Sequence, residues 1–361
     1  MKLPFEIELG IRKPLSQQAT DGFRSAIKEG FYRDGEPLPA LRSLAEAWGV
    51  SVKVPGRAYA RLADEGYVVL HPGRGAFARR SGVRTWNGNV LFVSVGSQGG
   101  FFMPNFIQSL RRGMEDANMR FYTAVVPTPP DGEGPDFASF ASYLNHPYDI
   151  VILMTDNRRL RAMVRSGVPR SLVVGRDLPG KVSPDVVVSL KDAERAFVED
   201  CRRAGVRRVR IMAYGRAVCH VERMLRAAGV QAETVRVNPL PGGACGEAVQ
   251  RAAHDCWANG LPQGKNRPDL VYFADDNLAL GSLVSFAEQR IRVPDDVFVV
   301  THGNRGSALP FACDLARIEV DPFRLGRETA RRALSRLKAN APSALIVCEA
   351  EYRRGASFPA A

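Results

Sequence analysis

The sequence has 361 residues, of which 45% are hydrophobic and 24% are charged. This length exceeds an ordinary single domain and the composition can bury a sizeable core, so a disulfide-rich miniprotein and a wholly disordered chain are both excluded. Fifty Lys and Arg against 38 Asp and Glu give a net charge of +12, which favours a polyanionic partner.

The excess positive charge is concentrated in one short stretch. Residues 42–84 contain eight Lys and Arg but only three acidic residues, an excess of five, whereas residues 1–41 contain six of each kind. If the protein binds a polyanion, we expect this stretch to carry the binding surface.

The first part of the chain is predicted to be helical. Apolar residues at helical spacing indicate helices over 16–30 and 38–49, each ending at a glycine. Ser51 is a natural N-cap for a third helix, which Gly66 ends. The short break between the second and third helices is typical of a helix-turn-helix.

Two short β-type runs, 67–70 and 76–78, follow the third helix and flank a Pro-Gly turn. This pattern predicts a two-stranded wing. The polar stretch that follows is the best linker candidate, so we expect a winged helix-turn-helix over 1–79, a linker over 80–88 and a second domain over 89–361.

The second domain is predicted to be α/β. Short apolar runs alternate with helix-like stretches, which indicates βαβ units and parallel sheets covered on both faces. A first series of runs starts at 90–95 and a second at 186–188, and we expect two lobes rather than one large sheet. The last helix, 321–339, and the last strand, 344–350, could join either lobe.

Four linked motifs in the first part resemble the winged helix-turn-helix of the GntR family of bacterial transcription regulators. They lie at 38–45, 49–51, 62–68 and 73–77. The alternative is a helical docking module with a solvated basic face.

The resemblance implies DNA-binding roles for four residues, Arg42, Ser51, Gly73 and Gly75. Cationic character on elements that should face DNA adds Lys53, Arg57, Arg61 and Arg74, although each could equally be a solvated surface cation. The sequence departs from the family at Val52 and Gly56, where arginines are usual, so the family's base readout is not carried over there.

The larger part resembles the periplasmic-binding-protein-like effector domain of LacI-type regulators. The likeness rests on 104–113, 173–176, 275–281, 293–300 and 321–327. A winged helix fused to such a domain is similar to the arabinose-type repressors of the GntR family.

This second resemblance implies a small molecule, often a sugar, between the lobes. By position it implies contacts from Phe106, Arg176 and Asp276, and His302 is placed where it could line the same cleft. Simpler interpretations are a surface ion pair for Arg176, an N-cap for Asp276 and a structural role for His302. The stretch 301–304 (Thr-His-Gly-Asn) and Ser189 stand where acidic residues are common in the family, which argues against a typical sugar.

Other classes of function find little support. The six cysteines are scattered without metal-ligand spacing, and the enzyme motifs with a nucleophile beside a base are absent, so we expect no metal site, no cofactor and no enzymatic activity. No apolar run is long enough to span a membrane, and we expect a cytoplasmic protein.

The sequence therefore favours a transcription regulator, expected to be a repressor. It would bind a double-stranded DNA operator as a homodimer and respond to a sugar or related metabolite. The alternative is a metabolite-binding or enzymatic α/β protein whose N-terminal helices mediate assembly.

Overall fold

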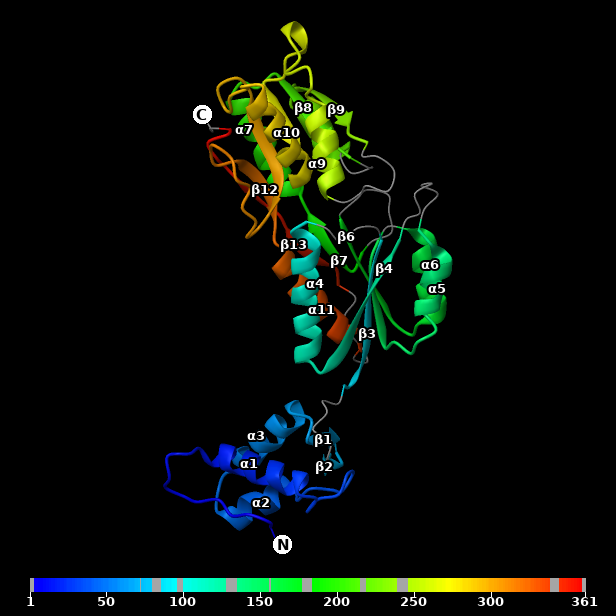
Figure 1. Cartoon of the computed structure of the whole chain (residues 1–361), viewed down its shortest axis with the longest axis vertical. Coiled ribbons are helices and arrows are strands. Elements are labelled where there is room, and N and C mark those ends of the chain that lie inside the picture. The colour runs from blue at the N-terminus through cyan, green and yellow to red at the C-terminus, as the bar shows by residue number, and fades with distance from the viewer. Residues whose placement is uncertain are drawn as a thin grey trace. The chain divides into compact units, whose positions relative to one another are not determined.

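The computed structural model describes residues 3–71, 73–79, 86–95, 100–127, 135–155, 157–176, 184–214, 219–238, 246–337 and 344–358. The chain divides into two compact units, Met1–Asn87 and Gly88–Ala361 (Figure 1). Residues 80–85 of the expected linker lie outside the described part.

The first unit is a three-helix head with a hairpin. Its elements are α1 (Leu15–Lys28), α2 (Leu41–Trp48), α3 (Lys53–Asp64), β1 (Val68–His71) and β2 (Gly75–Ala78). Phe23, Leu44 and Leu62 are fully buried in one core, because each helix turns its apolar face inward. Gly49 ends α2 in the left-handed conformation at φ 64°, which allows the tight turn into α3. The predicted helix-turn-helix and wing are confirmed.

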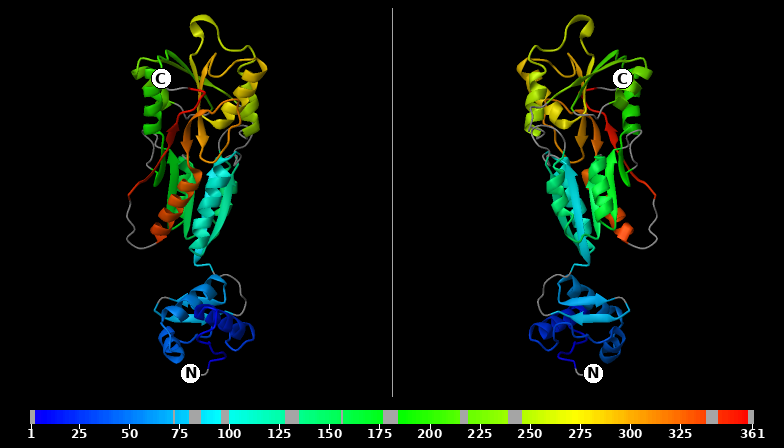
Figure 2. Two further views of the ribbon diagram at one scale, coloured as in Figure 1. Left: turned by 90° about the vertical axis from the view of Figure 1, so that its left-hand side faces the viewer. Right: turned by 90° about the vertical axis from the view of Figure 1, so that its right-hand side faces the viewer.

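The second unit contains two six-stranded sheets (Figure 2). The first has the order β13-β7-β6-β5-β3-β4 and the second β14-β12-β11-β10-β8-β9. All neighbouring strands are parallel except β12 and β14. The first sheet comprises β3 (Gly88–Val95), β4 (Met119–Val126), β5 (Ile150–Met154), β6 (Ser171–Arg176), β7 (Val186–Ser189) and β13 (Ile346–Glu349). The second comprises β8 (Arg208–Ala213), β9 (Gln231–Arg236), β10 (Leu270–Phe273), β11 (Phe298–Asn304), β12 (Ala316–Val320) and β14 (Glu351–Arg353).

Helices cover both faces of each sheet, as expected for parallel strands. Those of the first lobe are α4 (Phe102–Asp116), α5 (Phe137–Tyr143), α6 (Arg158–Gly167) and α11 (Pro322–Leu337). Those of the second are α7 (Lys191–Arg203), α8 (Cys219–Ala227), α9 (Gly246–Asp255) and α10 (Asp276–Glu288). Where α4 packs on α11 and α9 on α10, glycines permit close approach: a Cβ at Gly281 would lie 1.9 Å from the backbone oxygen of Gln250.

The chain crosses between the lobes three times. It crosses after β7, after β12 and between β13 and β14. The run 186–188, expected in the second series, forms β7, which pairs in parallel with β6 in the first sheet, so that prediction is wrong. The undecided last helix and strand both belong to the first lobe, where α11 packs on α4 and β13 pairs with β7.

Candidate functional sites

Four of the predicted DNA-binding cations are exposed on the head. Lys53 and Arg57 lie one turn apart on α3, Arg42 lies on α2, and Arg74 lies in the wing turn. None of the four has an ion-pair partner among the described residues. They can therefore meet phosphate or base edges without first breaking an ion pair.

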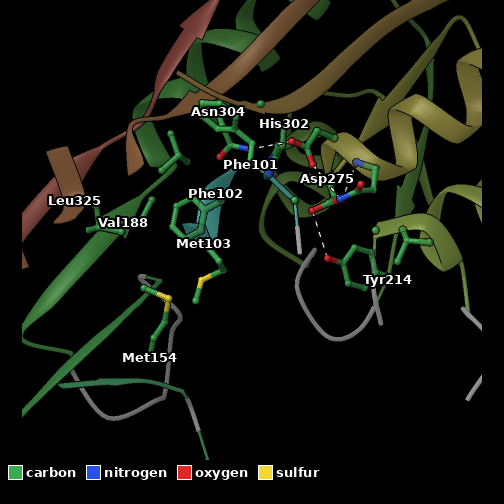
Figure 3. Close-up of a pocket in the computed structure, with 18 of the residues that line it drawn as sticks. Phe101, Phe102, Met103, Met154, Val188, Tyr214, Asp275, His302, Asn304 and Leu325 are labelled. Atoms are coloured by element: carbon green, nitrogen blue, oxygen red, sulfur yellow. Dashed lines mark hydrogen bonds between the residues drawn. The ribbon is translucent and has the colours of Figure 1, made fainter. Parts of the chain in front are cut away.

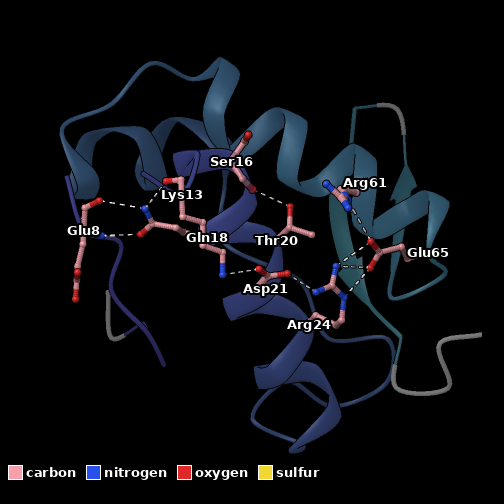
Figure 4. Close-up of polar contacts among 9 residues, drawn as sticks. All are labelled: Glu8, Lys13, Ser16, Gln18, Thr20, Asp21, Arg24, Arg61 and Glu65. Carbon is pink, nitrogen blue, oxygen red and sulfur yellow. Dashed lines mark hydrogen bonds and ion pairs between the residues drawn. The ribbon is translucent and has the colours of Figure 1, made fainter. Parts of the chain in front are cut away.

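Arg61 differs from these four cations because it is already engaged (Figure 4). Its Nε lies 3.3 Å from Glu65 Oε1. Glu65 in turn receives a two-pronged hydrogen bond from Arg24 on α1, at 2.7 and 2.8 Å, and Arg24 also pairs with Asp21. Hydrogen bonding from Arg24 lowers the pKa of Glu65. This cluster links α1 to the C-terminal end of α3, so the geometry favours a structural role for Arg61.

Ser51 is not the N-cap of α3. The cap position is Val52, which carries no side-chain cap, and the Ser51 hydroxyl accepts only a long hydrogen bond of 3.3 Å from the Lys53 backbone N–H. In the wing, Gly73 and Gly75 have positive φ values of 75° and 102°, a conformation that favours glycine. Their role is thus to shape the turn that presents Arg74.

The second unit contains a cavity of about 350 Å³ (Figure 3). Its walls come from the carboxyl ends of strands and the helices that follow them, the usual place for ligands in open α/β sheets. Met154 of β5 and Val188 of β7 lie on the first lobe's wall, while Tyr214, Asp275 and Asn304 lie on the second lobe's wall.

The polar wall starts at the N-terminus of α10. Asp275 is the N-cap, accepting hydrogen bonds from the Asn277 backbone N–H at 2.9 Å and from its side-chain amide at 3.1 Å. Asp276 is therefore not the N-cap of α10, and the interpretation of Asp276 as an N-cap is wrong. Its carboxylate lines the cavity and accepts a 2.9 Å hydrogen bond from Asn304 Nδ2.

Asp276 is electrostatically unusual. Burial, and next to it the negative charge of Asp275, raise the pKa of Asp276 to about 6, whereas the hydrogen bond from Asn304 acts in the opposite direction. The carboxyl is thus held in an environment that resists its charge. Such a perturbed group in a cavity is a typical mark of a functional site.

The aromatic residues of the apolar wall are Phe101 and Phe102, and the predicted contact from Phe106 is wrong. Phe106 is fully buried and packs between Phe92 and Phe102, away from the cavity surface. Phe102, one turn earlier on α4, lines the cavity together with Phe101 and Met103. The spacing of four residues places Phe102 and Phe106 on one helix face, so only the position of the helix distinguishes them.

His302 lines the cavity, and its Nε2 shares a hydrogen bond with the hydroxyl of buried Tyr272. Arg176 ends β6 opposite Val188, but its side chain lies outside the described part. His220 pairs with Glu194 at 2.7 Å and does not line this cavity. Met154, Asn304 and Asp275 were not predicted as contacts, although Met154 and Asn304 are the last residues of β5 and β11 and Asp275 closely follows β10.

Two further observations concern the described residues alone. No three His, Cys, Asp or Glu side chains among them are grouped so as to hold a metal ion. Nor is any helix in the described ranges both long and apolar enough to cross a membrane.

Comparison with known families matches both units. Residues 15–78 match the gntR family of bacterial regulatory proteins, and residues 191–358 match a periplasmic-binding-protein-like domain. An HTH-type transcriptional regulator of Streptomyces coelicolor is 38% identical over 69 residues, covering 19% of this chain and 26% of that protein. The HTH-type transcriptional repressor PurR of Mannheimia succiniciproducens is 34% identical over 84 residues, covering 23% and 25%. The matches thus span about a quarter of each curated relative.

Solved structures share the fold of the second unit. A LacI family transcriptional regulator from Silicibacter pomeroyi has a TM-score of 0.59 at 18% identity, covering 75% of this chain and 99% of that one. A LacI family regulator from Arthrobacter sp. FB24, in complex with lactose, has a TM-score of 0.56 at 14% identity, covering 76% and 100%.

These findings show that the chain combines a bacterial regulatory-protein domain with a periplasmic-binding-protein-like domain. More particularly, it joins a GntR-type helix-turn-helix domain to a periplasmic-binding-protein-like domain with the fold of LacI-type regulators.

Proposed function

We propose that this protein is a repressor that binds operator DNA through its head. Its affinity for the operator falls or rises when a small molecule occupies the cavity of the second unit. The single observation that carries the proposal is the cavity itself, which lies at the strand ends of a regulator fold and contains a perturbed carboxyl. The repressor assignment is supported by one relative, the HTH-type transcriptional repressor PurR of Mannheimia succiniciproducens.

The proposed mechanism is a change in the relation between two heads. Winged helices commonly read half-sites about 34 Å apart, so a homodimer fits a partly palindromic operator. A ligand that binds one arrangement of the lobes more tightly than the other shifts the population towards it. Because the chain crosses between the lobes three times, the arrangement of one lobe is mechanically tied to that of the other.

We propose that the cations of the head make two kinds of DNA contact. Lys53 and Arg57 lie near the N-terminus of α3. This part of a recognition helix approaches base edges, so we assign both residues to base contacts. Arg42 and Arg74, on α2 and in the wing, are assigned to phosphate or the minor groove.

Titration with operator and random duplex at several salt concentrations tests this proposal. Removing a phosphate contact should weaken both duplexes alike and lower the salt slope by about one, whereas removing a base contact should cost about 1–3 kcal/mol on the operator alone. Each of the four cations is replaced by alanine in turn. Arg195→Ala, at an exposed ion pair of the second unit, is the control for the loss of one positive charge.

Three outcomes would contradict the proposal. Equal losses on both duplexes for Lys53→Ala and Arg57→Ala would refute the assignment of base contacts to α3. Absence of binding to duplex DNA would refute DNA binding by the head, and binding that does not weaken with salt would refute its phosphate contacts.

The two units are also proposed to be separable, with the second folding alone as residues 88–361. Each has its own buried core, which is what independent folding requires. Limited proteolysis should leave a resistant fragment of that size, and its absence would refute separability.

A further inference from the structure

The two walls of the cavity have opposite chemical character (Figure 3). Every described lining residue from the first lobe is apolar or glycine, including Phe102, Met103, Met154 and Leu325. Among the described lining residues, the polar side chains all come from the second lobe. These described walls suit a molecule that presents an apolar surface to one side and polar groups to the other.

The polar wall is acidic. Asp275 and Asp276 stand side by side on it, and none of the described lining residues is Lys or Arg. Asp276 accepts hydrogen bonds from Asn304 at 2.9 Å and from Asn277 at 3.2 Å. Asp275 Oδ2 receives a long contact of 3.4 Å from the Tyr214 hydroxyl. Since a carboxylate oxygen can accept two hydrogen bonds, this wall keeps acceptor capacity for a ligand.

The apolar wall disfavours a ligand that carries hydroxyls on all sides. Hydroxyls placed against phenylalanine and methionine side chains would lose water without gaining partners, which costs free energy for each group. The acidic wall disfavours an anion, because a third negative charge would enter a site of low polarity.

We propose that the cavity binds an amphipathic organic cation, with a protonated amine at Asp275 and Asp276 and an apolar body against the first lobe. This inference rests on the proposed function, since it names the ligand class of the same cavity. The ammonium donates charge-assisted hydrogen bonds to the two carboxylates, while the apolar body contacts Phe102 and Met154. The ion pair neutralises the carboxyl that burial holds in an unfavourable state.

Matched probes on the full-length protein test the inference. Three apolar bodies, n-hexyl, phenylethyl and naphthylmethyl, are each offered as the amine, the alcohol and the corresponding carboxylate, with lactose as a polyhydroxyl probe. Binding is measured at pH 7.5 by calorimetry and by the shift in thermal unfolding. For at least one body we expect the amine to bind roughly tenfold more tightly than the alcohol, and the carboxylate to bind more weakly still.

Two variants assign the preference to the acidic wall. Asp276→Asn keeps the shape and an acceptor for Asn304 but removes the charge, so the amine and alcohol should bind about equally. Asp192→Asn removes an acidic group that is 69% exposed in a surface ion pair and should leave the preference unchanged. Intact folding of both variants is established by their thermal unfolding transitions.

The inference is overturned if no amine binds at millimolar concentration, if alcohols bind as tightly as amines, or if a carboxylate or lactose binds more tightly. Operator binding is measured on the same preparations. Lactose that binds and changes operator affinity would overturn the inference and support the proposed function. Absence of DNA binding with and without probes would refute the proposed function, while the amine preference would still be read from calorimetry.

Discussion

Replacing Asp276 by asparagine should stabilise the ligand-free second unit at neutral pH. The carboxyl has a pKa of about 6 in the folded protein against an ordinary value of 3.8, a difference of roughly 2. At about 1.4 kcal/mol for each factor of ten, ionising this group in the folded state costs up to about 3 kcal/mol. Asparagine avoids that cost and still accepts the hydrogen bond from Asn304 through its amide oxygen. We therefore expect the free energy of unfolding to increase by about 1–3 kcal/mol.

The sign of the pH dependence follows from the raised pKa. Above about pH 6 the carboxyl is ionised in both states, and the full cost is present. As pH falls from 6 towards 4, the folded state binds a proton that the unfolded state does not, and the native protein gains stability. The advantage of Asp276→Asn should therefore be largest above pH 7 and fade towards pH 4.

Urea unfolding of both proteins between pH 4 and 8 measures this difference through the transition midpoints. Asp192→Asn, at an exposed ion pair, should change the free energy of unfolding by less than about 0.5 kcal/mol at every pH. A destabilised Asp276→Asn, or an advantage that does not vary with pH, would refute the electrostatic reasoning and show that this carboxylate mainly supports the loop around it.

Three more predictions follow from particular contacts. Gly281→Ala should destabilise the second unit by about 2–4 kcal/mol in urea unfolding, because its Cβ would lie 1.9 Å from the Gln250 backbone oxygen. Gly56→Ala has its nearest neighbour at 4.0 Å and should instead stabilise the head by about 0.5–1 kcal/mol. Equal effects of the two substitutions would contradict the packing argument. Glu65→Gln should destabilise the head by about 1 kcal/mol at pH 7. Since Arg24 lowers the pKa of Glu65, this difference should shrink as pH falls below about 4.5, and a constant difference in urea titrations would show a non-ionic effect. Amine binding should weaken in calorimetry as pH falls from 7.5 to 5, because Asp276 takes up a proton near pH 6; a flat profile would place the amine elsewhere.

Most of the secondary structure could be predicted because burial leaves a local trace in the sequence. Strands covered on both faces are continuous apolar runs, and the wholly apolar stretch 150–154 forms β5. β12 gave no such signal because Arg317 and Glu319 alternate with its apolar residues. Their side chains form an ion pair at 3.3 Å, with 11% and 6% of their surfaces exposed. Only the fold supplies the partner that allows these charges to be buried.

Sheet membership could not be predicted in the same way. β7 is a short apolar run at the start of the second series in the chain, yet it pairs with β6 and β13 in the first sheet. Pairing depends on residues far apart in sequence, because β13 lies more than 150 residues after β7. Periodicity carries no information about such a partner.

The candidate sites show the same limit at the level of single side chains. Composition treats every arginine of the head alike, but Arg61 is held by Glu65 whereas Arg57, one turn earlier on the same helix, has no ion-pair partner among the described residues. Likewise, the sequence presents Asp275 and Asp276 as equivalent neighbours. Both line the cavity, but the helix geometry makes the first an N-cap that accepts from the Asn277 backbone N–H, whereas the second accepts from Asn304 and has its pKa raised by burial. The role that each arginine and each carboxylate can take is therefore decided by what else that group contacts.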